Sequence, residues 1–309
     1  MTRISTAGSY QSALLNLMAA QTRQADAQAR ISTEKNATDL AGFGRGSESL
    51  TALKAAQARV QGFVDTGDAL AARFDAQDLA LTRIDEAVGD ARSAIANAMA
   101  SENAVTLLLD VSNQFQAVQG ALNSKHQGDY LFAGSRTDTA PVNVQTLAQL
   151  TAATDVASTF TNDSLAPTSR VSESGPIKTG VLASDVGSEV FQIFRDIQAY
   201  SDDPATGPLS GKLTDAQKTF LTTQLDRLDT AKLAVVNITA NNGALAKQVE
   251  ATTTSNAAQV TMLDGLVSKR TDADMAQAVT DLEMSEIAIQ ASAQIISRLS
   301  DVSLLNFLR

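Results

Sequence analysis

The chain has 309 residues, of which 44% are hydrophobic and only 4% aromatic, and it contains no cysteine. The lack of cysteine excludes disulfides, zinc sites with thiolate ligands and thiol catalysis. The net charge of −10 argues against a nucleic-acid or anionic-membrane binder, because both kinds of protein need a basic face. The apolar content is mostly small, and alanine-rich seams favour long helices that pack closely side by side.

The N-terminal segment carries a sparse apolar stripe at helical spacing, formed by Tyr10, Leu14, Leu17 and Ile31. No apolar run reaches the roughly 18–20 residues of a membrane-spanning helix, and the first residues lack the apolar core of a secretory signal. We therefore expect a cytosolic protein, or one exported by a route that uses no cleaved signal.

Residues 53–98 show the clearest pattern in the sequence. Apolar or small side chains alternate at spacings of three and four, and only Gly67 and Gln77 depart from the pattern. This heptad seam predicts one long helix that packs in the core of a bundle. Residues 101–103 are typical of a helix break, and a second helix is predicted to follow over 108–122.

All five prolines lie between Pro141 and Pro208, so only the flanks are free to form long helices. Residues 128–141 combine a short apolar run with turn residues and predict a hairpin. Several short strands are expected within 142–182. A helix is expected over 185–200, ending at Asp202-Asp203-Pro204.

The helical period resumes at Leu213 and continues to about residue 263. Residues 271–274 supply capping side chains for a last helix. The apolar stripe of that helix consists of Met275, Val279, Leu282, Ile289, Ile296 and Leu299.

These elements predict a mainly α fold with a small β-rich insertion, built as a long antiparallel helical bundle or coiled coil with both termini paired at one end. We expect three domains: a terminal coiled coil (1–45 plus 270–309), a helical rod with a β-hairpin (46–140 plus 209–269) and an outer strand-rich domain (141–208). The terminal helices have too little bulk to cover all their faces. Their stability is therefore expected to come from neighbouring copies in a ring or tube.

No candidate for chemistry stands out, and we expect neither a catalytic site, a cofactor nor a metal. His126 is the only histidine and is interpreted as a solvated residue at a helix end. Asp202 and Asp203, and likewise Asp272 and Asp274, lack the oxygen-ligand spacing of a calcium loop and are interpreted as turn and cap residues.

Four stretches of the sequence resemble the flagellin superfamily, and within it the hook–filament junction branch. They are the opening 3–33, the segment Tyr130-Leu131-Phe132-Ala133-Gly134-Ser135 with its continuation to Asp138, residues 243–250, and the C-terminal stretch 272–308. The segment at 130–138 is similar to junction proteins rather than to filament flagellins.

The resemblance implies a structural subunit of the bacterial flagellum that is not an enzyme. It would connect another hook-associated junction protein to flagellin, after export through the flagellar type III route to the cell exterior. An export chaperone would hold the C-terminal part beforehand. No nucleic-acid partner and no membrane insertion are expected.

The assembly interface is expected on the terminal stripes. Its predicted residues are Ile4, Tyr10, Leu14, Leu17, Ile31, Met275, Val279, Leu282, Ile289, Ile296, Leu299, Leu304 and Leu305. Two alternatives remain open at this point: a filament flagellin, which shares the same ends, and a cytoplasmic coiled-coil signalling or scaffold protein.

Overall fold

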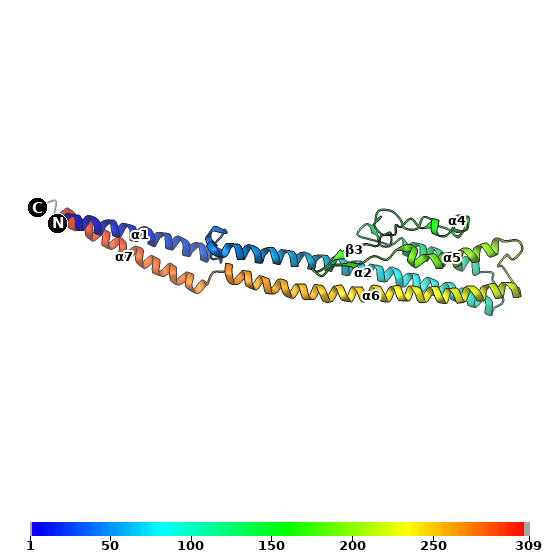
Figure 1. The fold of residues 1–309 in the computed structure, drawn as a ribbon. Helices are drawn as coiled ribbons and strands as arrows, with labels where there is room; N and C mark the ends of the chain where they lie inside the picture. Colours follow the sequence, from blue (N-terminus) through cyan, green and yellow to red (C-terminus); the bar gives the residue numbers. More distant parts are fainter. Residues whose placement is uncertain (1, 306–309) are drawn as a thin grey trace. The chain divides into compact units, whose positions relative to one another are not determined.

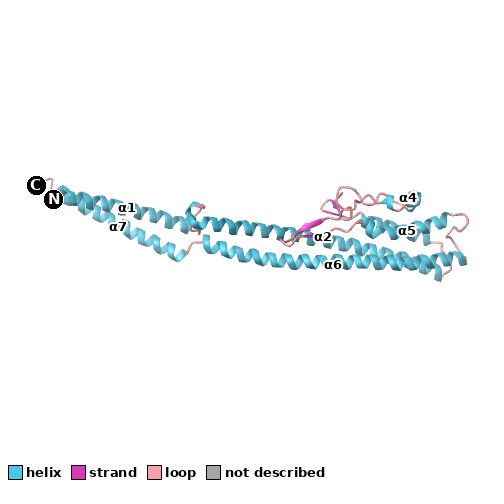
Figure 2. Cartoon of the chain, viewed as in Figure 1, coloured by secondary structure: helices cyan, strands magenta, loops and turns pink. Residues whose placement is uncertain are grey.

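The fold was obtained as a computed structural model that describes the backbone of residues 2–305 and the side chains of residues 8–299 (Figure 1). Most of these residues are helical, and the strands described form two separate two-stranded antiparallel sheets (Figure 2). The predicted class, mainly α with a small β-rich insertion, is confirmed.

The chain divides into two compact units. The first consists of Met1–Arg59 and Gln259–Arg309, and the second of Val60–Ala258. Helices α2 (Ser47–Ala100) and α6 (Asp215–Thr271) contribute residues to both units.

The first unit contains the two terminal helices, α1 (Thr2–Thr33) and α7 (Met275–Leu305). They run antiparallel and pack along each other, so the two chain ends lie at the same end of this pair, as predicted (Figure 1). A 3₁₀ segment, η1 (Ala41–Gly46), leads into the start of α2. It follows the end of α1 at Thr33 after a short irregular stretch.

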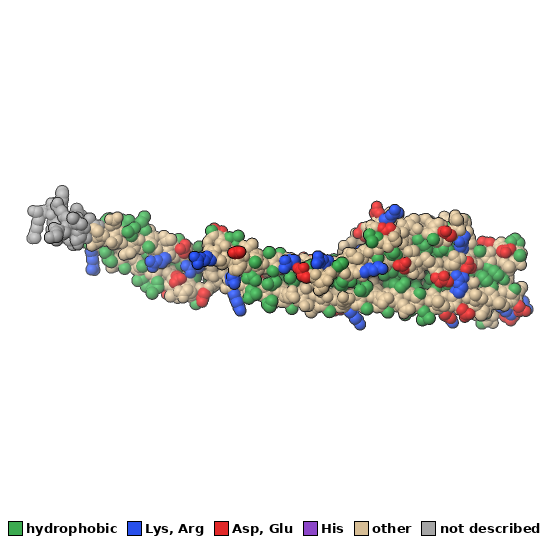
Figure 3. Space-filling model, in the orientation of Figure 1, with side chains coloured by type: hydrophobic (Ala, Val, Ile, Leu, Met, Phe, Trp, Pro, Cys, Tyr) green, Lys and Arg blue, Asp and Glu red, His purple; other side chains and the backbone are tan. Residues whose placement is uncertain are grey.

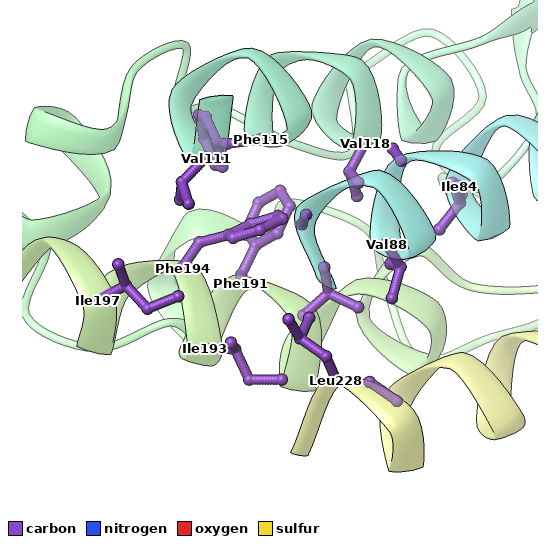
Figure 4. Packing of buried hydrophobic residues seen from close by; sticks show 14 of the residues in the cluster. Ile84, Val88, Val111, Phe115, Val118, Phe191, Ile193, Phe194, Ile197 and Leu228 are labelled. Atoms are coloured by element: carbon purple, nitrogen blue, oxygen red, sulfur yellow. The ribbon is translucent and has the colours of Figure 1, made fainter. Parts of the chain in front are cut away.

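The second unit has a core built by four helices: α3 (Leu107–Leu122), α5 (Ala183–Asp202) and parts of α2 and α6. Phe115 is its centre, with ring centroids 5.1 Å from Phe191 and 6.3 Å from Phe194 (Figure 4). Tilted and edge-on aromatic pairs of this kind stabilise a core beyond the area they bury. Three of the chain's few aromatic residues thus meet where these helices pack together.

The heptad seam predicted on α2 is confirmed. Its members from Leu70 to Ala98 are buried, and those from Leu53 to Phe63 are half-buried. The structure also explains the two departures from the pattern. At Gly67 the side chain of Thr253 occupies the space that a Cβ would need, and the amide of Gln77 donates to the Thr179 carbonyl at 3.5 Å.

The predicted helix boundaries also agree with the structure. α2 ends at Ala100 and α3 begins at Leu107, on either side of the expected break. α5 ends at Asp202, and α6 gives way to α7 through the predicted capping residues.

The hairpin lies earlier than predicted. It is formed by β1 (Lys125–His126) and β2 (Asp129–Tyr130), joined by a tight turn at Gln127 and Gly128 in which both residues have positive φ. Three consecutive side chains after β2, in 131–133, are buried. A strand would alternate its side chains between two faces, so the apolar run enters the core as irregular chain instead.

The expectation of several strands within 142–182 is largely wrong. One antiparallel pair is present, β3 (Thr168–Arg170) with β4 (Pro176–Lys178), and the rest contains α4 (Leu147–Ala152) and the 3₁₀ turn η2 (Ala157–Thr159). Side chains rather than strand neighbours satisfy much of this backbone. Asn123, for example, accepts from the Val142 N–H at 3.0 Å and donates to its carbonyl at 3.1 Å.

Candidate assembly surface

The two terminal helices meet through small side chains that recur every seven residues. Each of these side chains is at most 9% exposed. They are Ala13, Ala20 and Ala27 on α1, and Ala278, Ser285 and Ser292 on α7. Side chains of this size let two helix backbones approach closely, and the seven-residue repeat keeps the seam between the helices along their length. The Ser285 hydroxyl donates to the Leu282 carbonyl of its own helix at 2.7 Å, so the seam holds no unpaired polar group at this position.

Larger apolar side chains flank this small-residue seam at spacings of three or four. They are the half-buried members of the predicted interface: Leu17, Ile31, Leu282, Ile289, Ile296 and Leu299. The α1–α7 pair of a single chain already covers part of each of these side chains. Their role in contacts between copies stays a prediction.

Four predicted interface residues, Tyr10, Leu14, Met275 and Val279, are exposed. Ile4, Leu304 and Leu305 lie outside the residues whose side chains the structure describes. Their place in the assembly interface therefore stays a prediction from the sequence.

A further set of apolar side chains on the terminal helices was missed by sequence reasoning. Their exposed fractions lie between 51% and 65%, and Figure 3 shows apolar side chains at the surface of this part of the chain on the face in view. We call them the outer apolar residues: Leu15 and Met18 on α1, and Met284, Ile287 and Ile295 on α7. A soluble monomer normally leaves few large side chains this exposed along one element, so these positions are candidates for contacts with another molecule. Their spacing on α7, by three and by eight residues, was a usable sequence signal that the larger seam residues obscured.

The segment that follows the end of α1 lies against the segment that joins α6 to α7. We call these two segments, residues 34–36 and 271–273, the crossover clamp. The Ala273 N–H donates to the Glu34 carbonyl at 2.9 Å, and the Asn36 N–H donates to the Thr271 carbonyl at 2.7 Å. These bonds form a short β-like bridge centred on Lys35 and Asp272. The bridge ties the exit of α1 to the entry of α7.

Asp272 is the electrostatic centre of the crossover clamp. Its carboxylate accepts from Lys35 Nζ at 2.5 Å, from the Ser268 hydroxyl and from the Thr271 hydroxyl at 2.9 Å. These three donors, with the charge of Lys35, lower the pKa of Asp272 from 3.8 to about 2. One turn into the helix pair, Arg30 adds an ion pair with Asp281 at 3.3 Å.

The histidine prediction is wrong. His126 lies in β1, its side chain is half-buried, and Nε2 is buried without a hydrogen-bond partner among the described residues. The strand forms because the tight turn at 127–128 folds the chain back directly after α3. From the sequence, His126 is instead expected at the end of the preceding helix.

The aspartate predictions hold for Asp203 and Asp274. Asp203 accepts from the Ala205 N–H at 2.8 Å within the turn after α5, and Asp274 caps α7 by accepting from the Gln277 N–H at 3.1 Å. Asp202 accepts from the Gln198 amide at 2.9 Å.

Among the described side chains, those of residues 8–299, no group of three or more histidine, cysteine or acidic residues is arranged to hold a metal ion. Among the same residues, none of the helices has the length and hydropathy required to span a lipid bilayer.

Comparison with known proteins connects both the sequence and the fold to flagellar proteins. Residues 225–308 match the family described as the bacterial flagellin C-terminal helical region, a stretch that includes all of α7. A search among curated proteins gave no significant match.

The solved structures that share the fold include two from flagellar proteins. A protein from Vibrio parahaemolyticus, described as a flagellar hook-associated protein, aligns with a TM-score of 0.60 at 13% identity, over 75% of this chain and 100% of that one. FlgL from Bacillus cereus aligns with a TM-score of 0.53 at 13% identity, over 71% of this chain and 98% of that one. The resemblance to flagellin seen in the sequence is thereby confirmed for residues 225–308, which are similar to the helical C-terminal region of bacterial flagellin. Over 71–75% of its length, the chain shares the fold of a flagellar hook-associated protein and of FlgL.

Proposed function

We propose that this chain is a structural subunit of the bacterial flagellum and acts as an adaptor at the hook–filament junction. The observation that carries the proposal is the arrangement of the terminal helices. α1 and α7 close on each other through small side chains and leave large apolar side chains exposed. The match of residues 225–308 to flagellin and the fold shared with FlgL support the same role. The function requires packing only and no chemistry.

In this proposal the outer apolar residues contact neighbouring copies in a ring or tube, while the small-residue seam stays closed within each chain. Covering one Met, Leu or Ile side chain fully contributes about 1.5–3 kcal/mol, so a few such contacts per copy suffice for a cooperative assembly. Assembly therefore does not require the α1–α7 pair to open.

The partners follow from the same role. One end of the assembly would contact the other hook-associated junction protein and the other end would receive flagellin. An export chaperone would hold the C-terminal part before export through the flagellar type III route to the cell exterior. The three-domain division into 1–45 plus 270–309, 46–140 plus 209–269, and 141–208 belongs to this proposal, with the first domain forming the inner coiled coil.

The test replaces Met284 and Ile287 together by glutamate. Both side chains are exposed, so the purified variant should keep the helical content of the parent, whereas assembly should fail because charges would be buried between copies. The matched control is Leu79→Glu, a similarly exposed apolar residue on α2.

The measurement is filament growth and swimming in a flagellated source strain whose own copy of the gene is deleted. We expect growth with the control variant and none with the double variant. Normal filaments with M284E/I287E would contradict the proposed contacts.

The match to flagellin also favours a second candidate, a filament flagellin. Abundance separates the two functions. A flagellin would dominate sheared filaments in a stained gel, whereas a junction adaptor would be a trace component that immunogold labelling locates at the hook end of the filament.

A further inference from the structure

A small pocket lies between the β1–β2 hairpin and α2 in the second unit. Its volume is about 240 Å³, and its wall includes Thr66, Ala69, Leu70, Arg73, His126, Asp129, Leu131 and Ser169. The pocket is independent of the terminal helices and plays no part in the proposed assembly.

Arg73 is the unusual residue of this pocket. Its Nε is buried without a hydrogen-bond partner in the described part of the chain, and its Nη2 donates a long hydrogen bond to the Leu131 carbonyl at 3.4 Å. Burial lowers the pKa of Arg73, and the nearby Asp129 carboxylate acts in the opposite direction. The two side chains do not form an ion pair in the described structure. Burying a charged guanidinium away from water without pairing it to a carboxylate costs folding free energy. Such a group is suited to bind an anionic partner.

His126 supplies the complementary unpaired atom. Its Nε2 is buried and has no partner among the described residues. When the imidazole is neutral with its hydrogen on Nδ1, Nε2 accepts a hydrogen bond. Asp129 stands directly opposite His126 in the hairpin register and offers carboxylate oxygens on the same wall.

The pocket therefore joins an unpaired cationic donor to two acceptors, with the apolar side chains of Ala69, Leu70 and Leu131 beside them. A simple anion would meet the repulsion of Asp129, and a simple cation would meet that of Arg73. We propose that this pocket binds a small zwitterion, an α-amino acid with an aliphatic side chain, whose carboxylate accepts from Arg73 and whose ammonium donates to Asp129 and His126.

The geometry sets a condition on binding. Nε of Arg73 and Nε2 of His126 are both covered in this structure, so binding through these two atoms requires both side chains to rotate toward the pocket. Charge-assisted bonds to a carboxylate and an ammonium are strong enough to drive such a change.

The test is isothermal titration calorimetry of the full chain with L-alanine, sodium acetate and methylamine, each up to about 10 mM, a range that covers weak small-ligand binding. We expect L-alanine to bind at least about tenfold more tightly than either half-ligand, a difference of 1.4 kcal/mol. Undetectable binding of L-alanine overturns the proposal. So does acetate binding as tight as that of L-alanine, because it would mark a simple anion site.

Variants test which residues bind the ligand. Arg73→Gln and Asp129→Asn should each weaken L-alanine binding at least about tenfold, which is the scale of one lost charge-assisted bond. The matched control is Arg83→Gln, an exposed arginine of the same helix, which should leave the affinity unchanged. Far-UV circular dichroism checks that each variant folds, and the three-ligand comparison on the parent protein stands even if a variant does not. Unchanged affinity in a folded Arg73→Gln variant would place the ligand elsewhere and reject the site.

Discussion

At Asp272 one carboxylate joins three side-chain donors and bridges two segments that are more than two hundred residues apart in the sequence. Such a group makes part of the fold sensitive to acid. Its pKa is lower in the folded chain than the ordinary value of 3.8, so the folded state binds this proton less readily than the unfolded state. The stability that the carboxylate contributes is present above pH 3.8 and is lost as the pH falls toward 2.

We therefore predict that acid loosens the crossover clamp. Pepsin cleavage at Leu40 and Phe43, just after the clamp, should rise in the parent protein as the pH falls from 3.8 toward 2. In Asp272→Asn, which lacks the charge at every pH, cleavage should already be fast at the upper end of this range. Asp78→Asn, an exposed carboxylate on α2, serves as the control and should behave like the parent. Equal cleavage of the parent and Asp272→Asn at all pH values would show that the clamp does not depend on this group.

Gly67 lies at a close approach of α2 to α6. A Cβ at this position would overlap the side chain of Thr253, whereas nothing lies within 4 Å of the Cβ position at Gly62 on the same helix. We predict that Gly67→Ala destabilises the chain by about 1–3 kcal/mol through overpacking. Gly62→Ala should instead stabilise it by about 0.5–1 kcal/mol through helix propensity.

Urea unfolding of both glycine variants measures the two effects. In a double-mutant cycle, Thr253→Ala should restore much of the stability lost in Gly67→Ala, because it removes the atoms that overlap. If Gly67→Ala proved as stabilising as Gly62→Ala, the close approach of the two helices would be refuted.

At the scale of elements, the α1–α7 pair depends on small side chains at one heptad position. Ala20 is 2% exposed in the seam, while its neighbour Ala19 faces solvent. We predict that Ala20→Leu forces the helices apart and costs about 1–3 kcal/mol, as overpacking does in other tight interfaces. Ala19→Leu should change stability by less than about 0.5 kcal/mol, as expected for an exposed helix position.

Thermal unfolding followed by circular dichroism can detect this difference, provided that the loss of α1 and α7 is resolved from that of the second unit. Hydrogen exchange followed by mass spectrometry reads the two units separately. Faster exchange in α1 and α7 of Ala20→Leu alone is the expected result, and equal exchange in the two variants would argue that the seam tolerates bulk.

The elements themselves were predictable to different degrees. The seam over 53–98 could be predicted because packing repeats the same local rule at every turn of a helix. The strands could not, because Leu131 and its neighbours are placed by the core of the second unit rather than by their own alternation. The small-residue seam was present in the sequence as alanines at 13, 20 and 27, but its meaning depends on which helix lies opposite.

The pocket residues show the same limit. Arg73 lies among many charged residues of α2, and no spacing in the sequence distinguishes it from Arg83. The pocket arises only when β1 and β2 fold against that turn of the helix. His126 could be singled out as the one histidine, but its burial depends on the turn that follows it.

At the scale of the whole molecule, the large apolar core lies entirely within the second unit. We predict that a chain lacking residues 1–35 and 275–309 still folds and unfolds cooperatively, because the four-helix core around Phe115 is intact. Such a chain should fail to join filaments, because it lacks α1 and α7. Denaturant unfolding and assembly in the deletion strain measure the two outcomes. A truncated chain that aggregates without a cooperative transition, or one that still supports filaments, would each refute one half of the prediction.

The seven-residue repeat of small side chains has one more consequence. Because Ala13, Ala20 and Ala27 are alike, sliding α7 along α1 by one heptad would again place small side chains against small ones, so the seam alone leaves several alignments nearly equal in energy. The bridge between Lys35 and Asp272 removes this degeneracy, since only one alignment of the helices brings segments 34–36 and 271–273 together. The crossover clamp thus sets the register of the helix pair. It determines how far the end of one terminal helix extends beyond the end of the other.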